Sequence, residues 1–279
     1  MLYFFSQLRD VFFGFNIFKY ITFRAAMAAV TTFLVCILLG PVFTRFLKEK
    51  KIREYAKRAD CPDLDKFAES KQGVPTMGGL FIISSIVISV LLWADLSNRY
   101  IWLTLGTCIY LTVLGFLDDW VKLTGGGVGK QRGLRPKTKL LAQIFLACFI
   151  GVYVSCDPST STTVEVPFLK NFAVEIGIFY FALVAVMLIG TTNAVNLTDG
   201  LDGLAIGCVL IVTSALAVLC YVSGHMNFSQ YLFIPYIPRA AELTVFCTAM
   251  AGASLGFLWF NSHPATIFMG DAGSLPLGG

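Results

Sequence analysis

The chain has 279 residues, of which 56% are hydrophobic and only 14% are charged, and its mean hydropathy is +0.74. A typical soluble domain carries about 25% charged residues and cannot bury this much apolar surface within itself. The composition therefore excludes a soluble enzyme, a secreted disulfide scaffold and a disordered protein, and a net charge of +4 does not call for a nucleic-acid partner. We expect an all-α, polytopic integral membrane protein.

Residues 1–23 come first and alternate Phe and Tyr with charged residues, which predicts an interfacial segment or a short helix leading into the first span. Seven uncharged stretches follow, each long enough for a membrane-spanning helix, which needs roughly 17 to 25 apolar residues. An eighth begins near residue 270, and the whole chain, 1–279, is predicted to be one transmembrane domain. The complete spans are predicted at residues 25–44, 77–94, 100–117, 140–156, 176–197, 204–222 and 243–260.

Lys and Arg residues predict the orientation of these spans, because cytoplasmic loops of membrane proteins are enriched in them. Loop 45–76 holds nine and loop 118–139 holds six, whereas the whole opposite face, with the N-terminus, holds six. The face that contains these two loops, together with 198–203 and 261–271, is therefore predicted to be cytoplasmic. The N-terminus is then predicted to be outside.

Five aspartates gather on this predicted cytoplasmic face: Asp118 and Asp119 end the third span, and Asp199, Asp202 and Asp271 follow the fifth and seventh. An ionisable group at a membrane boundary is costly unless it is paired or functional, so together they form a candidate site. The alternative is that they are ordinary helix caps. That alternative is weakest for Asp118 and Asp119, because a helix C-terminus disfavours negative charge.

Carboxylates that converge on one patch would repel one another unless a cation lay among them. Oxygen ligands without histidine or thiolate favour Mg²⁺ or Mn²⁺. Carboxylates, a divalent metal and basic side chains are together the elements of phosphoryl transfer. The basic residues of 118–139 supply such cations, although they also satisfy the positive-inside rule without any substrate.

Five motifs occur in an order that resembles a known family: GVPTMGG at Gly73–Gly79, GFLDDW at Gly115–Trp120, NAVNLTDGLDGLA at Asn193–Ala205, FLWFN at Phe257–Asn261 and FMGDAGS at Phe268–Ser274. They resemble the phospho-N-acetylmuramoyl-pentapeptide-transferase family, within the polyprenyl-phosphate N-acetylhexosamine-1-phosphate transferase superfamily. Members have about ten spans and a histidine-rich cytoplasmic loop that this sequence lacks. The chain is therefore expected to be a C-terminally incomplete copy, whose activity as it stands is in doubt.

The resemblance implies transfer of phospho-N-acetylmuramoyl-pentapeptide from its UDP-linked donor to undecaprenyl phosphate, which forms lipid I and releases UMP. This reaction is the first membrane step of peptidoglycan synthesis, and so belongs to cell wall biogenesis, cell shape and cell division. It implies Mg²⁺ as the cofactor, the bacterial cytoplasmic (inner) membrane as the location and no nucleic-acid partner, and it leaves a homodimer open. Two alternatives stay open at this point: a sibling N-acetylglucosamine-1-phosphate transferase, and a membrane transporter, which would place polar residues near the bilayer midplane.

The resemblance also implies roles for individual residues. Asp118 and Asp119 match paired catalytic aspartates, and Asp118 is expected to bind or deprotonate the lipid phosphate. Asp271 matches a catalytic aspartate that binds magnesium, and Asn196 is expected to complete the metal site with its amide oxygen. Phe268 is expected to stack on the uracil ring. The full set of expected substrate-binding residues is Lys71, Asn196, Asp199, Gly200, Leu201, Asp202, Asn261 and Phe268.

Overall fold

The computed structural model describes residues 1–8, 12–50, 74–124, 133–156, 163–165 and 173–279. This described part is almost entirely helical, as the sequence predicted, with one short hairpin of strands β1 (Thr163–Glu165) and β2 (Ala173–Glu175). The helices are η1 (Leu2–Leu8), η2 (Phe13–Lys19), α1 (Ile21–Glu49), α3 (Gly79–Trp93), α4 (Arg99–Thr124), α5 (Pro136–Ser155), α6 (Phe179–Thr198), α7 (Leu204–Ser223), α8 (Met226–Leu232), η3 (Ala240–Glu242), α9 (Leu243–Asn261) and α10 (Asp271–Gly278).

Six helices in the described part are long and apolar enough to cross a membrane: α1, α4, α5, α6, α7 and α9. Most of them match the predicted spans closely, but α1 and α4 extend several residues beyond their uncharged stretches. At the end of α1 the exposed basic side chains of Arg45 and Lys48 reach the aqueous phase, and in the extension of α4 Lys122 pairs with Asp118 and Asp119, so charge does not end either helix. The extension of α4 corrects one expectation, because Asp118 and Asp119 lie inside this helix and not at its end.

The predicted span 77–94 differs from the others, so the structure has six helices of spanning length where the sequence predicted seven. Its helix, α3, has only 15 residues, which gives about 22 Å at 1.5 Å per residue and falls short of a hydrocarbon core about 30 Å thick. The helix starts late because Thr76, Met77 and Gly78 form a turn that contacts the segment before α10. Nine of its 15 residues are buried, so α3 lies in the interior of the bundle.

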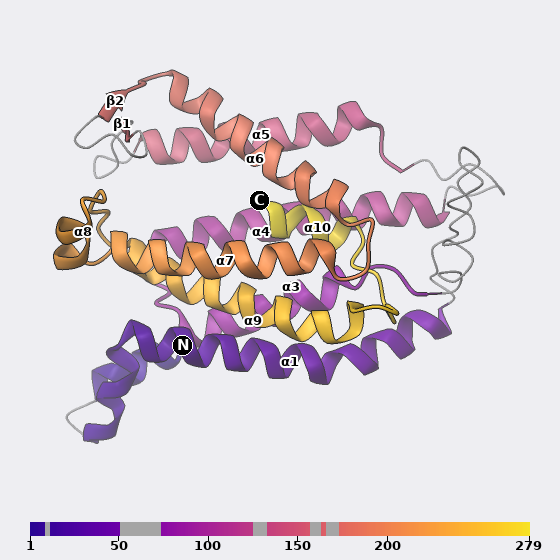
Figure 1. Cartoon of the computed structure of the whole chain (residues 1–279), viewed down its shortest axis with the longest axis horizontal. Helices are drawn as coiled ribbons and strands as arrows, with labels where there is room; N and C mark the ends of the chain where they lie inside the picture. Colours follow the sequence, from indigo (N-terminus) through magenta and orange to yellow (C-terminus); the bar gives the residue numbers. More distant parts are fainter. Residues whose placement is uncertain (9–11, 51–73, 125–132, 157–162, 166–172) are drawn as a thin grey trace.

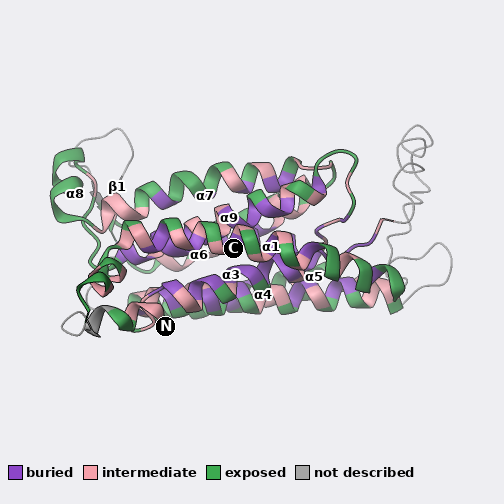
Figure 2. Ribbon diagram, turned by 90° about the horizontal axis from the view of Figure 1, so that it is seen from below, coloured by how far each residue is buried: buried purple, intermediate pink, exposed green. Residues whose placement is uncertain are grey.

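The long helices run side by side along the longest axis of the molecule (Figure 1). Helices α1, α7 and α9 pack together on one side of α3, and the pair α5 and α6 lies on the other side of α4 and α10. Figure 2 shows buried residues on α3 and on the inward faces of its neighbours, with exposed residues facing outward. The outward faces of the spanning helices are rich in large apolar side chains, which is typical of helices that contact lipid.

The loops fall at two opposite ends of the bundle in the alternation that the sequence predicted (Figure 1). One end holds the α6–α7 turn, the segment between α9 and α10 and the ends of α1 and α4; we call it the acidic end, because all five aspartates named above lie there. The other end holds η1, η2, α8 and the hairpin β1–β2, in which Val164 pairs with Val174. The hairpin and α8 were not predicted, because elements this short leave no clear hydrophobic period.

The N-terminal segment forms two short 3₁₀ helices that pack against the bundle through aromatic rings. Phe5 lies 5.5 Å from Phe15, and Phe18 lies 6.0 Å from Trp93, measured between ring centroids. Both predictions for residues 1–23, an interfacial segment and a short helix leading into the first span, stay open.

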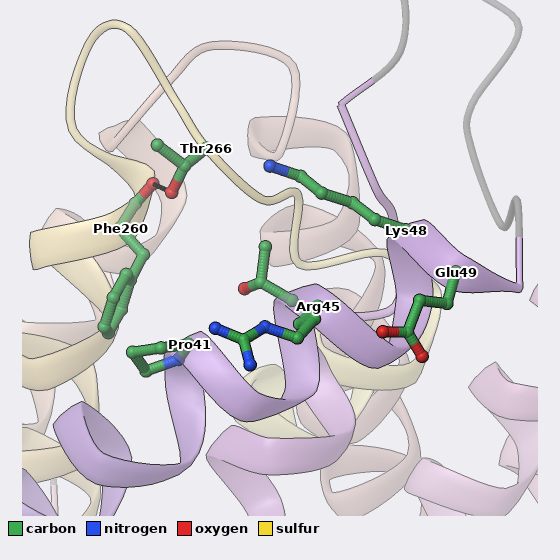
Figure 3. A pocket seen from close by; sticks show the side chains of 7 residues that line it. Pro41, Arg45, Lys48, Glu49, Phe260 and Thr266 are labelled. Atoms are coloured by element: carbon green, nitrogen blue, oxygen red, sulfur yellow. Dashed lines mark hydrogen bonds between the residues drawn. The ribbon is translucent and has the colours of Figure 1, made fainter.

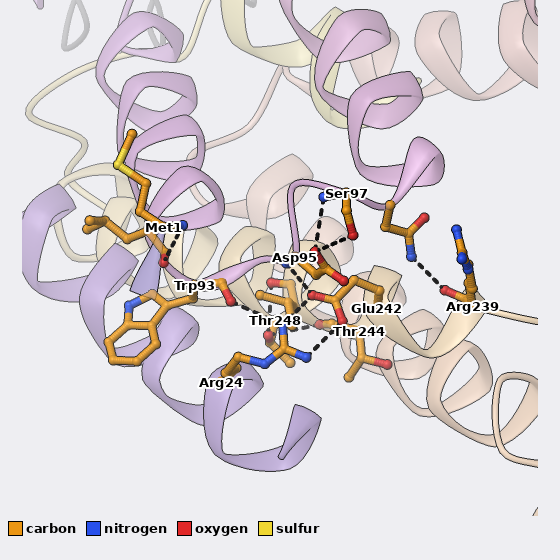
Figure 4. A network of polar contacts seen from close by, with 12 residues as sticks. Met1, Arg24, Trp93, Asp95, Ser97, Arg239, Glu242, Thr244 and Thr248 are labelled. Atoms are coloured by element: carbon orange, nitrogen blue, oxygen red, sulfur yellow. Dashed lines mark hydrogen bonds and ion pairs between the residues drawn. The ribbon is translucent and has the colours of Figure 1, made fainter. Parts of the chain in front are cut away.

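A buried ion pair joins α1 to the start of α9 at the end opposite the aspartates (Figure 4). The guanidinium of Arg24 donates to both carboxylate oxygens of Glu242, and its Nη2–Oε2 distance is 2.9 Å. The same carboxylate accepts a hydrogen bond from the backbone N–H of Asp95, and Arg24 also donates to the carbonyl of Trp93. Because both side chains are almost fully buried, loss of either partner would leave a desolvated charge.

We predict that Glu242→Gln lowers the melting temperature of the detergent-solubilised protein. The loss should correspond to about 3 to 5 kcal/mol, because Gln keeps the acceptor for Asp95 but leaves the Arg24 charge unpaired. The double variant Arg24→Met/Glu242→Gln should recover part of this loss. Equal melting temperatures for the single and double variants would contradict the ion-pair explanation.

Candidate active site

Helix α10 lies against α4 and α3 with almost no space between the backbones. A Cβ atom on Gly115 of α4 would lie 2.1 Å from the backbone oxygen of Asp271, and one on Gly79 of α3 would lie 2.1 Å from the backbone nitrogen of Gly273. No side chain fits at either contact, so both positions require glycine. This close approach brings the start of α10 to the aspartates of α4.

The carboxylates of Asp118, Asp119 and Asp271 form one compact cluster at the acidic end. Each offers a ligand oxygen, and these oxygens all lie within 4.8 Å of one another. All three residues are buried, and Asp118 is 0% exposed. Sequence analysis predicted a site of five aspartates, and this cluster brings three of them together, while Asp199 and Asp202 lie next to the α6–α7 turn.

Two lysines neutralise much of the negative charge in the cluster. Lys122 Nζ lies 2.7 Å from Asp118 Oδ2 and 3.0 Å from Asp271 Oδ1. Lys139 Nζ, from the first turns of α5, lies 2.8 Å from Asp118 Oδ2 and 2.5 Å from Asp271 Oδ2. Three carboxylates and two ammonium groups leave a formal charge of −1 (−3 + 2).

Backbone N–H groups stabilise the buried carboxylates further. Asp118 Oδ1 accepts a hydrogen bond of 2.7 Å from the N–H of Leu134, and Asp119 Oδ2 accepts one of 3.0 Å from the N–H of Ala272. The second donor belongs to the first turn of α10, where unpaired N–H groups and the helix dipole favour negative charge. Asp119 therefore holds the start of α10 as well as contributing charge to the cluster.

The segment before α3 and the segment before α10 pair through their backbones, which joins two of the motifs. Phe268 donates from its N–H to the carbonyl of Pro75 and accepts from Gly78, and Gly79 donates to the carbonyl of Met269. Met77 and Gly270 both have positive φ angles, of 75° and 72°. A non-glycine residue in this conformation is strained, and such strain gathers at functional sites.

A second group of predicted residues lies in the α6–α7 turn and the segment after α9. The buried side chain of Asn261 accepts a hydrogen bond of 3.0 Å from the N–H of Gly203 and donates one of 2.9 Å to the carbonyl of Ile267. Asp202 Oδ2 lies 3.1 Å from Nδ1 of His263, which is largely exposed. Asn261 thus ties the turn to the segment that leads to Asp271, with both ends of its amide in use.

The remaining predicted residues are less closely tied to the cluster. Asn196 Oδ1 accepts a hydrogen bond of 2.8 Å from Ser274 Oγ, which places it against α10, three residues beyond Asp271. Gly200 and Leu201 are exposed in the α6–α7 turn, Asp199 caps α6, and Phe268 is half-buried. Lys71 lies outside the described residues.

Sequence reasoning missed a buried polar network that supports the cluster from the α5 side. Gln143 lies one turn after Lys139, and its Nε2 donates to Thr192 Oγ1 at 3.2 Å, while its Oε1 accepts from Asn193 Nδ2 at 3.0 Å. Gln143 is the most polar residue within the predicted span 140–156, and a polar residue buried among helices must find partners there. The occurrence of a glutamine inside an apolar span was the signal that could have identified Gln143.

The arrangement suits a hard divalent cation and phosphate groups. Its donors are three carboxylates with oxygen atoms close enough to share one ion, and hard cations such as Mg²⁺ prefer oxygen ligands. Lys122 is partly exposed, so a phosphate group could reach its ammonium group from solvent. Buried carboxylates beside accessible basic groups therefore fit a site that binds a metal with a phosphorylated substrate.

Comparisons with known proteins agree with this chemistry. The pattern of the family described as Glycosyl transferase family 4 matches residues 101–279. A phospho-N-acetylmuramoyl-pentapeptide-transferase of Desulfosudis oleivorans is 46% identical over 265 residues, which cover 95% of this chain and 72% of that protein. The proteins of the same name from Pelobacter propionicus and Thermodesulfovibrio yellowstonii are 47% and 43% identical, and this chain covers 72% and 74% of their lengths.

We predict that Gly115→Ala displaces α10 and destabilises the protein by about 1 to 3 kcal/mol, as overpacking of a tight contact does. Gly106→Ala on the same helix is the matched control, because a Cβ there would meet nothing within 4 Å. Thermal unfolding in detergent measures both. A Gly115→Ala variant as stable as Gly106→Ala would contradict the close seating of α10.

Proposed function

This chain belongs to glycosyl transferase family 4, among the phospho-N-acetylmuramoyl-pentapeptide-transferases, and we propose that it transfers phospho-N-acetylmuramoyl-pentapeptide from its UDP-linked donor to undecaprenyl phosphate. The products are lipid I and UMP. The observation that carries this proposal is the buried cluster of three aspartates and two lysines at one end of a membrane-spanning bundle. The donor is water-soluble and the acceptor lies in the bilayer, so the reaction requires a site at their boundary.

The reaction exchanges one phosphate bond for another. An oxygen of the undecaprenyl phosphate forms a bond to the phosphorus attached to the sugar, and the bond from that phosphorus to the bridging oxygen breaks, so that UMP leaves. Catalysis of such a transfer consists mainly of positioning and of stabilising charge on the phosphate oxygens. The two lysines and three aspartates of the cluster are charged groups that could serve both tasks.

We assign the carboxylates to the metal and the lysines to the phosphates. Asp118, Asp119 and Asp271 would hold one Mg²⁺, and Asn196 is the neutral oxygen ligand that we expect beside them. A bound Mg²⁺ would offset negative charge on the donor diphosphate. Lys122 and Lys139 would then contact phosphate oxygens instead of the carboxylates that they now share with each other.

Asp118 is the residue that we assign to the lipid phosphate. Its Oδ2 lies within 2.8 Å of both ammonium groups, so a phosphate drawn to either lysine arrives next to this carboxylate. Asp119 differs, since its Oδ2 holds the first turn of α10 through Ala272. We therefore propose that Asp118 acts on the lipid phosphate in addition to the metal, whereas Asp119 holds the start of α10 in addition to offering a metal ligand.

We propose that the uridine diphosphate part of the donor binds beside the cluster, at the α6–α7 turn. Asp199, Gly200, Leu201 and Asp202 lie in or next to this turn, and Phe268 lies on the segment that leads to Asp271. We propose that Lys71, which lies outside the described residues, also binds this part of the donor. Asn261 acts here by holding the turn and the segment together rather than by contacting the base, because its amide is already bonded at both ends.

We propose that the acidic end faces the cytoplasm of the bacterial inner membrane, where the nucleotide-linked donor is made. The excess of Lys and Arg in the loops of this end supports that orientation. The relatives compared above carry the name phospho-N-acetylmuramoyl-pentapeptide-transferase, which supports this transfer over the two alternatives. The aspartate cluster also lies near one end of the bundle and not at its centre, which disfavours a transporter.

We predict that Asp118→Asn and Asp271→Asn each lower the rate of UMP release by more than about 100-fold, because each removes charge at the reacting phosphates. Asp119→Asn should be milder, because the amide oxygen still accepts from Ala272. Release of UMP by purified protein with both substrates measures the effect.

The matched control for these variants is Asp95→Asn, at the opposite end of the bundle, where the carboxylate bonds only to Ser97 among the described residues. It should keep the rate of the unmodified protein. Turnover within tenfold of that rate for Asp118→Asn or Asp271→Asn would contradict the assigned roles.

We predict that UMP release depends on a divalent metal ion. Removal of divalent ions with a chelator should abolish UMP release, and Mg²⁺ should restore it, because the carboxylate cluster is assigned to this ion. In Asp119→Asn the concentration of Mg²⁺ needed for half-maximal rate should rise, since one ligand is lost. An unchanged rate in the presence of chelator would exclude the metal from the mechanism.

A further inference from the structure

A groove of about 390 Å³ lies at the acidic end, on the side of the bundle formed by α1 and α9 (Figure 3). It is separate from the aspartate cluster and includes none of the residues assigned to the reaction. The residues that line it are Pro41, Thr44, Arg45, Lys48, Glu49, Phe260 and Thr266.

The charges of the groove favour an anion. Figure 3 shows the side chains of Arg45 and Lys48 extending toward Phe260 and Thr266, with Glu49, the one acidic residue of the lining, beside them on α1. Within the part of the chain that the structure describes, neither Arg45 nor Lys48 forms an ion pair. Two cations therefore face the groove without an anionic partner in the described structure, and Arg in particular suits the geometry of a phosphate.

An apolar stripe on α1 leads directly to this pair of cations. Leu34, Leu38, Val42 and Phe46 are all at least half exposed and recur every four residues, so they share one outward face of the helix. From Leu34 to Phe46 the stripe is about 18 Å long at 1.5 Å per residue, slightly more than half of a hydrocarbon core about 30 Å thick. The stripe thus covers the depth of one leaflet, and the cations lie where its headgroups begin.

We propose that this groove binds the phosphate of an anionic phospholipid headgroup, while the acyl chains lie along the stripe on α1. The combination of a leaflet-deep apolar stripe and two cations at its end matches a lipid rather than a soluble anion, which would use only the cations. The groove also includes Thr266, whose N–H and hydroxyl both bond to the carbonyl of Phe260. A lipid bound there would lie against the segment that runs from α9 to Asp271.

Native mass spectrometry of the protein in micelles with added phosphatidylglycerol tests the proposal. The double variant R45Q/K48Q should bind this lipid about 25-fold more weakly, at about fivefold for each basic side chain next to an anionic headgroup. Binding of phosphatidylcholine, whose headgroup carries no net charge, should be weaker in the unmodified protein. If R45Q/K48Q does not yield a monodisperse protein, the single variants R45Q and K48Q give the same comparison, each with about a fivefold loss.

The matched control is R135Q/K137Q, which removes two exposed basic residues from the same end of the molecule but outside the groove. It should leave phosphatidylglycerol binding unchanged, and an equal loss in both double variants would overturn the proposal. A third arm uses inorganic phosphate without lipid. If phosphate alone raises the melting temperature of the unmodified protein but not of R45Q/K48Q, the groove takes a soluble anion and the lipid assignment fails.

Discussion

The seating of α10 against α4 and α3 is the contact on which the rest of the site depends. Gly115 and Gly79 let the backbones approach until no side chain fits between them. The carboxylate of Asp271 consequently reaches those of Asp118 and Asp119, although these residues belong to different helices. Asp119 then closes the arrangement by accepting a hydrogen bond from the first turn of α10. The contacts that pack α10 against α4 and α3 are therefore also the contacts that assemble the carboxylate cluster.

Burial makes charge balance the second constraint. Three buried carboxylates in one cluster would repel one another, and each would lose its hydration on leaving water. Lys122, Lys139, the N–H of Leu134 and the start of α10 offset this cost. One negative charge remains uncompensated, so the cluster is prepared for a further cation. A cation bound there would leave the two lysines available to phosphate groups.

The two ends of the bundle use buried charge differently. At the end opposite the aspartates, Arg24 and Glu242 form a buried pair that also bonds to the backbone of Trp93 and Asp95. Such a pair holds α1 against the start of α9, and because both side chains are almost fully buried, a ligand cannot reach them. At the acidic end the charges are shared among five side chains, and Lys122 is partly exposed. This arrangement would allow the lysines to exchange the carboxylates for a phosphate in the proposed reaction.

Amino-acid sequence determined the fold class, the order of the spans and the end at which the aspartates lie, because apolar stretches and loop charges depend only on local composition. It also identified Asp118, Asp119 and Asp271 as one group through the resemblance to a family. Only the tertiary structure decided which cations reach them. Six basic residues occupy positions 118–139. Of those that the structure describes, Lys122 and Lys139 contact the carboxylates, because Lys122 lies one turn after Asp118 on α4 and Lys139 lies in the first turns of α5, which packs beside the cluster. The short α3, the bonded amide of Asn261 and the support from Gln143 were equally hidden, since each depends on contacts between segments far apart in the chain.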